Sequence, residues 1–362
     1  MRSPVVRALV GRRLNLLLVF APFSWVLWRV SPDSPWLFAA AALSLVPLAG
    51  LIGLGTEELA KQTGPTLGGF LNATFGNAAE LIIAFVALRE HHIDLVKASI
   101  TGSIIGNLLL VLGLSIFVGG IGRPRQRFNR TAASNLSVML FLAVVALVMP
   151  AVFDLSLYGS LSAHPSAIDR LSFWSALVLI GAYAGSLVYA FTAQRDLFRP
   201  DESGHRGHPL STRAALGVLA IGTILTTVQA EILVGALEPA LTRFGFTEMF
   251  VGVIVIAVIG NAAEHYSAIV AARRNQMTLA VEIAVGSSAQ IALLVAPAVV
   301  LYSMAIGHPM SLLFNAFEIT AIALSVLATV IVVLDGESNW VEGLQLMAVY
   351  LILALAFYFV PA

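Results

Sequence analysis

Two carboxylates in this chain stand in the same five-residue motif. The sequence Gly-Asn-Ala-Ala-Glu occupies residues 76–80 and recurs letter for letter at residues 260–264. Each copy lies in an apolar stretch long enough to cross a bilayer, where an ionisable side chain is costly and usually functional. A carboxylate in such a low-dielectric place favours neutralisation by a proton or a cation. The motif therefore predicts an ion site in which Glu80 and Glu264 hold about two protons or one divalent cation, each displacing the other.

Helical spacing places small residues on the same face as each carboxylate, since positions i, i+3, i+4 and i+7 share a face. This face carries Ala73, Gly76, Asn77, Ala84 and Ala87 around Glu80, and Ala257, Gly260, Asn261, Ala268 and Ala271 around Glu264. Small residues let a second helix approach closely. We therefore expect a close-packed seam that contains one carboxylate and one amide in each half.

The apolar stretch that follows each motif carries a second polar face. Its residues are Ser99, Gly102, Ser103, Gly106 and Asn107 in the first half, and Gly286, Ser287, Ser288 and Gln290 in the second. The closely spaced glycines permit a local break that would free carbonyl oxygens to line a cavity. Carboxylates, amides, hydroxyls and carbonyls together make an all-oxygen site. Such a site suits a hard cation, and calcium better than magnesium, because calcium accepts a flexible set of roughly six to eight oxygens.

Composition assigns the broad class of protein. Apolar residues make up 59% of the chain and charged residues 11%, whereas a soluble domain is about 25% charged. This indicates an all-α polytopic membrane protein that lies in the lipid bilayer. The net charge of zero gives no reason to expect a nucleic-acid partner, and the absence of cysteine excludes disulfides and thiolate metal sites.

About eleven apolar stretches approach the roughly 20 residues that a bilayer crossing needs. They lie near residues 14–30, 36–55, 66–89, 95–118, 134–154, 169–193, 212–238, 246–272, 277–305, 311–334 and 340–361. With the N-terminus in the cytoplasm, most Lys and Arg residues, including the group between Arg123 and Arg130, fall on the cytoplasmic side, as the positive-inside rule requires. Short loops are typical of a protein of the prokaryotic inner membrane.

The motif copies at residues 76 and 260 lie 184 residues apart, and other identities share this offset. Arg89 matches Arg273, Gly102-Ser103 matches Gly286-Ser287, and residues 109–111 match residues 293–295. We interpret this as an internal duplication. The predicted organisation is an N-terminal transmembrane helix (1–35), a first five-helix repeat (36–194), a cytoplasmic linker (195–211) and a second five-helix repeat (212–362). Because five is odd, the repeats are inverted, and such transporters bind their substrate at the midplane between them.

The motifs resemble the cation/proton exchanger branch of the calcium/cation antiporter superfamily. The similarity rests on Gly-Asn-Ala-Ala-Glu followed by Leu-Ile-Ile-Ala at 81–84, the same motif followed by His265, and Gly-Ser-Ser-Ala-Gln-Ile-Ala-Leu at 286–293. Thr-Glu-Glu-Leu-Ala at 56–60 and Ala-Glu-Ile-Leu-Val at 230–234 are also similar to that branch. The resemblance extends over most of residues 36–361.

The resemblance implies a calcium:proton antiporter that works by alternating access and has no cofactor or enzymatic activity. Glu80 and Glu264 would be the metal ligands, assisted by Asn77, Asn261, Ser103, Ser287 and Gln290, with Ala73 and Ala257 in the same seam. It also implies that Glu57, Glu58 and Glu231 act in gating or proton transfer. Many members carry an acidic helix between the halves, whereas residues 195–209 here mix acidic residues with Arg and His.

Several alternatives stay open from the sequence. Ser103 and Ser287 could serve helix packing alone, and His265 could either tune the proton affinity of Glu264 or simply pack. An intramembrane serine hydrolase would use Ser287 or Ser288 with His265, although the first half has Leu81 where the second has His265. A passive cation channel, or an antiporter for sodium, potassium or manganese, is also compatible with the ligand types. Whether copies of the chain form a homo-oligomer is not readable.

Overall fold

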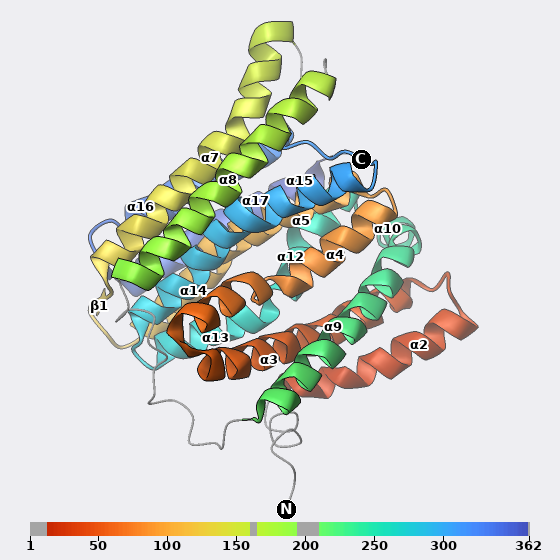
Figure 1. Ribbon diagram of the computed structural model, residues 1–362, viewed down its shortest axis with the longest axis horizontal. Helices are drawn as coiled ribbons and strands as arrows, with labels where there is room; N and C mark the ends of the chain where they lie inside the picture. The colour runs from red at the N-terminus through yellow and green to blue at the C-terminus, as the bar shows by residue number, and fades with distance from the viewer. Residues whose placement is uncertain (1–12, 160–164, 194–209, 361–362) are drawn as a thin grey trace, which may run out of the picture. The chain divides into compact units, whose positions relative to one another are not determined.

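Residues 13–159, 165–193 and 210–360 are described by the computed structural model, apart from a few side chains, that of Ala73 among them. Within these ranges the chain is almost entirely helical (Figure 1). It divides into two compact units. Unit 1 comprises Met1–Val86 and Tyr183–Gly245, and unit 2 comprises Ala87–Ala182 and Phe246–Ala362. Each unit therefore takes segments from both halves of the sequence.

Unit 1 is built from the helices that surround the first motif and the start of the second half. In chain order these are η1 (Arg13–Val19), α2 (Phe20–Val30), α3 (Pro35–Phe75), the beginning of α4 (Ala78–Arg89), the end of α8 (Pro165–Ala193), α9 (Thr212–Gly235) and α10 (Leu237–Phe244). Helix α3 packs along α9 at Gly55, where a Cβ atom would come within 2.9 Å of the Leu219 nitrogen. A small residue is thus needed where these two helices meet.

Unit 2 contains the remaining elements. These are α5 (Ile93–Ile105), η2 (Gly106–Val111), α6 (Leu112–Gly120), β1 (Gln126–Arg127), α7 (Arg130–Tyr158), most of α8, α11 (Glu248–Phe250), η3 (Val251–Ile256), α12 (Ala257–Gly260), α13 (Ala262–Arg273), α14 (Met277–Gln290), η4 (Ile291–Val295), α15 (Ala296–Ala305), α16 (Ala316–Val333), β2 (Glu337–Ser338) and α17 (Trp340–Phe359). Asn315 and Asn339 begin α16 and α17 with capping boxes that pair them with Glu318 and Glu342.

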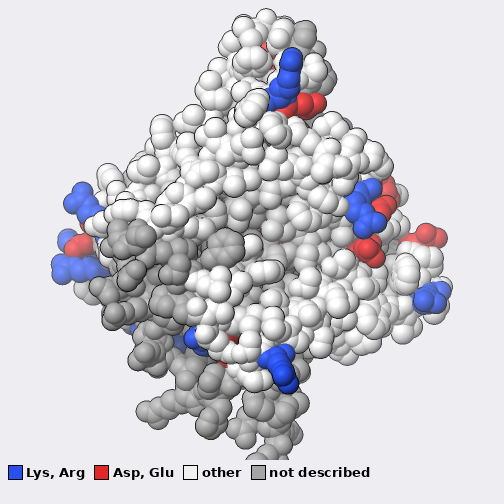
Figure 2. Space-filling model, in the orientation of Figure 1, with Lys and Arg blue, Asp and Glu red and all other residues white. Residues whose placement is uncertain are grey.

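The apolar helices expose large hydrophobic side chains, as an integral membrane protein requires. On α7 the side chains of Val138 and Phe141 are each 66% exposed, and on α17 that of Ile352 is 65% exposed. On the face shown in Figure 2, charged side chains are few and are separated by uncharged surface. Among the described residues, eight helices are long and apolar enough to cross a membrane, or nine if the bent pair Leu237–Phe244 and Glu248–Gly260 is one span. The exact number of eleven spans stays a prediction.

Helix α3 runs from Pro35 to Phe75 but bends sharply along its length. A Cβ atom on Gly68 would lie 2.4 Å from the carbonyl oxygen of Ala60, and the membrane-length part of the helix ends at Thr63. The separate stretches expected at 36–55 and 66–89 therefore lie on either side of this bend. Two glutamates share one lysine just before the bend, since Lys61 Nζ lies 2.9 Å from Glu57 Oε1 and 2.8 Å from Glu58 Oε1. Ion pairs at i,i+4 and i,i+3 stabilise a helix, so these pairs favour helix beyond the first apolar stretch.

The expected breaks after the second polar face take another form. The spans Ile93–Gly120 and Met277–Ala305 are each unbroken, and each contains a π-helical segment, η2 in the first and η4 in the second. A π-helical turn inserts one extra residue into a helix and is frequent at functional sites. The chain therefore changes its helical register beside the second polar face and keeps the helix.

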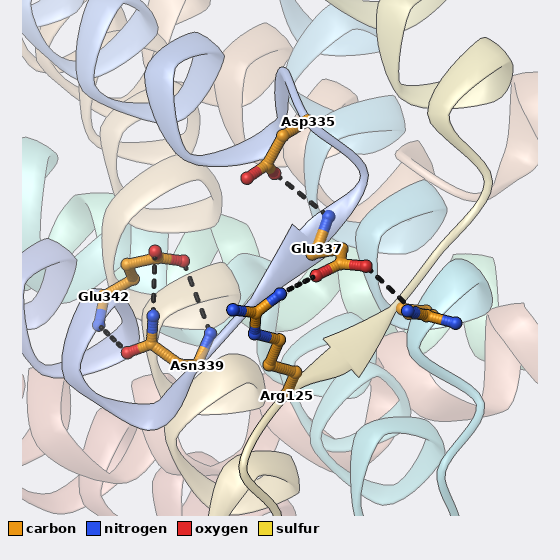
Figure 3. Close-up of polar contacts among 6 residues, drawn as sticks. Arg125, Asp335, Glu337, Asn339 and Glu342 are labelled. Atoms are coloured by element: carbon orange, nitrogen blue, oxygen red, sulfur yellow. Dashed lines mark hydrogen bonds and ion pairs between the residues drawn. The ribbon is translucent and has the colours of Figure 1, made fainter.

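A short antiparallel strand pair, absent from the sequence-based expectation, joins two loops of unit 2 (Figure 3). Gln126 pairs with Ser338 and Arg127 with Glu337. The Glu337 carboxylate accepts hydrogen bonds from Arg125 at 3.1 Å and from Arg127 at 2.9 Å, while Asp335 accepts one from the Glu337 backbone. The loop after α6 is thereby fixed to the loop before α17.

Candidate cation site

Each motif copy stands at an interruption between two helices. In the first copy, α3 ends at Phe75 and α4 begins at Ala78; in the second, α12 ends at Gly260 and α13 begins at Ala262. Both glutamates consequently lie in the first turn of the helix that follows. The amino end of a helix favours negative charge, so the shared Gly-Asn interruption gives each carboxylate the same local setting.

Close backbone approach brings the second motif against helix α5. A Cβ atom on Gly102 would lie 2.0 Å from the carbonyl oxygen of Val253, and one on Gly252 would lie 2.5 Å from the Cβ atom of Ala98. Only glycine permits this crossing of α5 and η3. The crossing places Ser103 of α5 and Asn107 of η2 within reach of Asn261.

Five polar side chains of unit 2 form one hydrogen-bonded network. Ser287 Oγ donates to Glu264 Oε2 at 2.5 Å, and Asn107 Nδ2 donates to Ser287 Oγ at 3.2 Å and to Asn261 Oδ1 at 3.1 Å. Asn261 Nδ2 donates in turn to Ser103 Oγ at 2.9 Å and to the Ala257 carbonyl oxygen at 2.9 Å. Four of the five, all but Glu264, are buried. The structure thus brings together Glu264, Asn261, Ser103 and Ser287, all named from the sequence.

Asn107 is the member of this network that sequence reasoning left out of the ligand set. Its side chain is 1% exposed, and its Oδ1 atom is a buried acceptor with no hydrogen-bond partner among the described residues. An unsatisfied buried acceptor costs about 1–3 kcal/mol and points to a missing ion or water. The second polar face of the sequence contained the signal, because Asn107 was placed on it with Ser103, but the ligand set implied by the resemblance did not include Asn107.

The first motif lies in unit 1. Asn77 is fully buried in the turn between α3 and α4, and Glu80 is half-buried in α4. One backbone hydrogen bond lies on each side of the turn, from Gly76 N to Asn72 O and from Leu81 N to Asn77 O. Since Glu80 and Glu264 belong to different units, their joint coordination of one ion stays a prediction.

The remaining residues named from the sequence occupy varied positions. Ala257 is buried and lends its carbonyl oxygen to Asn261, while Gln290 is half-buried at the end of α14. Ala73 lies in α3, and its side chain is outside the described part. His265 is half-buried on α13, directly after Glu264. Ser288 donates to the carbonyl oxygens of Ile104 and Ala284, which ties α14 to α5.

The acidic residues outside the motifs also differ from one another. Glu58 is buried, and its Oε2 atom accepts a hydrogen bond from the Leu210 backbone nitrogen at 2.9 Å. Glu57 is half-buried and pairs with Lys61, and Glu231 is exposed on α9. Glu58 therefore connects α3 to the residue that precedes α9. A role for these three residues in gating stays a prediction.

The unit 2 network has the chemistry of a hard-cation site. Its potential ligands are carboxylate, amide and hydroxyl oxygens, and within the described ranges there is no cluster of three or more His, Asp or Glu side chains that could hold a metal. Oxygen donors of mixed kinds suit calcium better than a transition metal. A cation coordinated by Asn107 Oδ1 and Glu264 would also need oxygen ligands from other groups.

Comparison with known proteins supports a transporter. The model of the family described as sodium/calcium exchanger protein matches residues 33–192 and 214–359. A Ca(2+)/H(+) antiporter of Synechocystis is 42% identical over 96% of this chain and 97% of its own length. The Ca(2+)/H(+) antiporter ChaA of Bacillus subtilis is 40% identical over 96% of this chain and 99% of its own length.

Solved structures share the fold. The structure of native YfkE has a TM-score of 0.83 and 38% identity, and the match covers 96% of this chain and all of YfkE (100%). The H+/Ca2+ exchanger CAX has a TM-score of 0.71 at 16% identity, covering 96% of this chain and 91% of CAX, which shows a common fold. The chain belongs to the sodium/calcium exchanger family and, within it, to the branch of the cation/proton exchangers.

Proposed function

We propose that this chain is a calcium:proton antiporter in which Glu264 and Asn107 contribute oxygens to the transported cation. The observation that carries the assignment of the site is the buried Oδ1 atom of Asn107, which has no partner among the described residues and belongs to the network that also holds Glu264. Full-length relatives at about 40% identity carry the names of Ca(2+)/H(+) antiporters, which supports calcium and protons as the exchanged ions. No cofactor and no enzymatic step are needed.

The network explains how binding of one ion displaces the other. Ser287 Oγ donates a hydrogen bond to Glu264, and Asn107 and Asn261 fix the positions of the surrounding oxygens. A cation in this place replaces the proton that would otherwise neutralise the carboxylate. Coupled exchange follows if the site changes its accessibility only when it is neutralised, which prevents a leak of either ion.

The finer organisation also belongs to this proposal. Glu80 and Asn77 supply the matching ligands of the first repeat, while Ser103, Gln290, Ala73 and Ala257 complete the seam. We include eleven transmembrane helices, of which ten form two inverted repeats at residues 36–194 and 212–362. The N-terminus lies in the cytoplasm, and the membrane is the inner membrane of a prokaryote. The matching positions of η2 and η4 support the duplication.

The proposal also includes candidates for proton transfer or gating, namely Glu57, Glu58, Glu231 and His265. It does not require a homo-oligomer.

Measuring proton release tests the proposal. Purified protein is reconstituted into proteoliposomes with an acidic interior, and external calcium is added while the internal pH is recorded. We expect calcium-dependent proton efflux in the wild type and none in Glu264→Gln or Glu80→Gln, because an amide cannot exchange a proton for a cation. Glu238→Gln, the same substitution at an exposed position on α10, serves as the matched control and retains the flux.

Other outcomes would change the assignment. A calcium current without proton counterflow would indicate a passive channel. Proton release driven by sodium, potassium or manganese, and not by calcium, would retain the antiporter and change its ion. Full activity in the Glu80→Gln, Glu264→Gln double variant would disprove the site. The hydrolase alternative has no support, because the family is one of transporters and Ser287 and Ser288 donate to Glu264 and to main-chain carbonyls.

A further inference from the structure

Two histidine rings from distant parts of unit 2 lie against each other. The ring centroids of His91 and His308 are 4.2 Å apart with an interplanar angle of 80°. Both residues are exposed. Neither is involved in the proposed cation site, and His91 is the first of two histidines in the turn between α4 and α5. The contact therefore invites an explanation separate from calcium transport.

The backbone of His91 adopts a left-handed conformation at the end of α4. Its φ angle is +68°, a region where glycine is favoured and where His and Asn are enriched among the other residues. The turn is a Schellman motif, since His92 N donates to Ala87 O at 2.9 Å and His91 N donates to Leu88 O at 3.1 Å. The position of the His91 ring is therefore fixed by a defined helix end.

The second half of the chain provides an internal reference for this turn. Helix α13 ends in the same motif, with Gln276 N bonded to Ala271 O and Asn275 N bonded to Ala272 O, and Asn275 has a φ angle of +64°. Asn275 stands at the 184-residue offset from His91. The turn itself therefore needs only a residue that tolerates a positive φ, and asparagine meets that need. An imidazole is not required by the fold.

The opposite ring is equally well positioned. Helix α15 ends at Ala305 and is followed by Gly307 at a φ angle of +80°, and His308 N donates to Ser303 O at 3.0 Å. The segment that follows is anchored, because Met310 N donates to the buried hydroxyl of Ser303 at 2.8 Å and Leu312 N donates to Ser172 Oγ at 2.9 Å. On the other side, His92 Nδ1 lies 2.8 Å from Glu248 Oε1 and anchors the α4–α5 turn. Two fixed helix ends thus present two imidazoles to one point.

We propose that His91 and His308 form a binding site for a late first-row divalent metal ion such as Zn²⁺ or Ni²⁺. Rotation about the side-chain torsions would direct one nitrogen from each ring to a common metal at about 2 Å, and water would fill the other positions. Imidazole selects zinc, copper or nickel over calcium. This site is therefore chemically distinct from the all-oxygen network around Glu264. A metal bound here would connect the α4–α5 turn to the segment after α15.

Binding of Ni²⁺ and Zn²⁺ to the purified protein tests this inference. The full chain is prepared in detergent with its affinity tag removed, and binding of each ion alone is measured by calorimetry. We expect one site per chain, and at least about tenfold weaker binding in His91→Asn and in His308→Gln. His91→Asn keeps a residue that Asn275 shows to be compatible with this turn, so the loss reports the imidazole and not the fold.

Controls separate this site from the transport site. Glu264→Gln should bind Ni²⁺ as the wild type does. His92→Gln, which removes the imidazole that anchors the turn to Glu248, should weaken Ni²⁺ binding less than His91→Asn. Affinities should rise from Mn²⁺ through Co²⁺ and Ni²⁺ to Cu²⁺, and a large excess of Ca²⁺ should not displace Ni²⁺. Displacement by Ca²⁺, or equal binding in the wild type and in a His91→Asn, His308→Gln double variant, would overturn the proposal whatever the transport assay shows.

Discussion

The span Ile93–Gly120, formed by α5, η2 and α6, and the span Met277–Ala305, formed by α14, η4 and α15, have almost the same backbone and different polar side chains. They begin at positions 184 residues apart, and η2 and η4 end at Val111 and Val295, which share that offset. At this offset Ser103 corresponds to Ser287, but Asn107 corresponds to Ile291 and Thr101 to Val285. Of these two spans, Ile93–Gly120 carries the Asn107 amide of the network, and Met277–Ala305 has an apolar residue at the matching position. Two spans with the same order of helical segments therefore contribute different side chains to the site.

The largest effect is expected where the two helices differ inside the network. Asn107→Leu removes the acceptor Oδ1 and both donated hydrogen bonds. We expect the apparent affinity for calcium in proteoliposome exchange to fall by about 10–100-fold, as for the loss of a ligand or of the group that orients one. Ile291→Leu, at the equivalent position, should leave it unchanged. Equal affinities in the two variants would mean that Asn107 serves packing alone.

A second difference concerns how closely each helix is approached. A Cβ atom at Gly102 would lie 2.0 Å from Val253 O, whereas one at Gly286 would have Leu136 Cδ2 as its nearest neighbour, at 3.9 Å. Gly102→Ala should therefore destabilise the protein by about 1–3 kcal/mol through overpacking, and Gly286→Ala should be tolerated. Thermal unfolding in detergent measures both. A normal melting temperature for Gly102→Ala would show that α5 and η3 can separate without cost.

A third, smaller effect is expected at Thr101. Its hydroxyl donates to Glu318 Oε1 at 3.2 Å, and both side chains are buried. Thr101→Val copies the residue of the second helix and removes this bond, at an expected cost of about 1 kcal/mol in the free energy of unfolding. The reciprocal Val285→Thr tests whether position matters, since it adds a hydroxyl without that partner. If both variants unfold like the wild type, the contact to Glu318 contributes nothing.

The smallest effect is expected after the span Ile93–Gly120, where α6 leads to the strand pair β1–β2 (Figure 3). Arg125 and Arg127 are 74% and 81% exposed where they pair with Glu337. Exposed ion pairs contribute about 0–1 kcal/mol, so Glu337→Gln should shift the melting temperature little, and less still in high salt. A large, salt-sensitive loss would show that the strand pair helps to hold unit 2 together.

The sequence indicated much of the site because the motif was repeated and its spacing was helical. Helical spacing placed Asn261 and Glu264 on one face and Ser103 and Ser287 on a second polar face, the resemblance named these residues as ligands, and the structure brings the four side chains into one network. Asn107 lies on the same polar face but was not among the ligands that the resemblance implied. Its part in the network depends on contacts with Asn261 and Ser287, which spacing along one helix does not show.

Other features depend on contacts that no local pattern encodes. Helix α3 bends so that Gly68 lies against the backbone of Ala60, a contact that a scan for apolar residues does not detect. The pairing of Gln126 with Ser338 joins residues more than half the chain apart. The segment η2 begins with the poor helix formers Gly106 and Asn107, whereas η4 is wholly apolar, so composition alone does not predict the π-helical segments. These are tertiary effects that override local preference.

The contact between Glu58 and Leu210 has a consequence for biogenesis. Glu58 Oε2 and the Gln62 side chain bind the backbone of Leu210, on a segment synthesised about 150 residues later. Because unit 1 is closed by α9 and α10 from the second half, a ribosome that has made only the first half cannot deliver a finished unit. The early helices must wait in the bilayer as separately inserted segments, with Glu58 and Lys61 already paired, until the later ones arrive to complete the assembly.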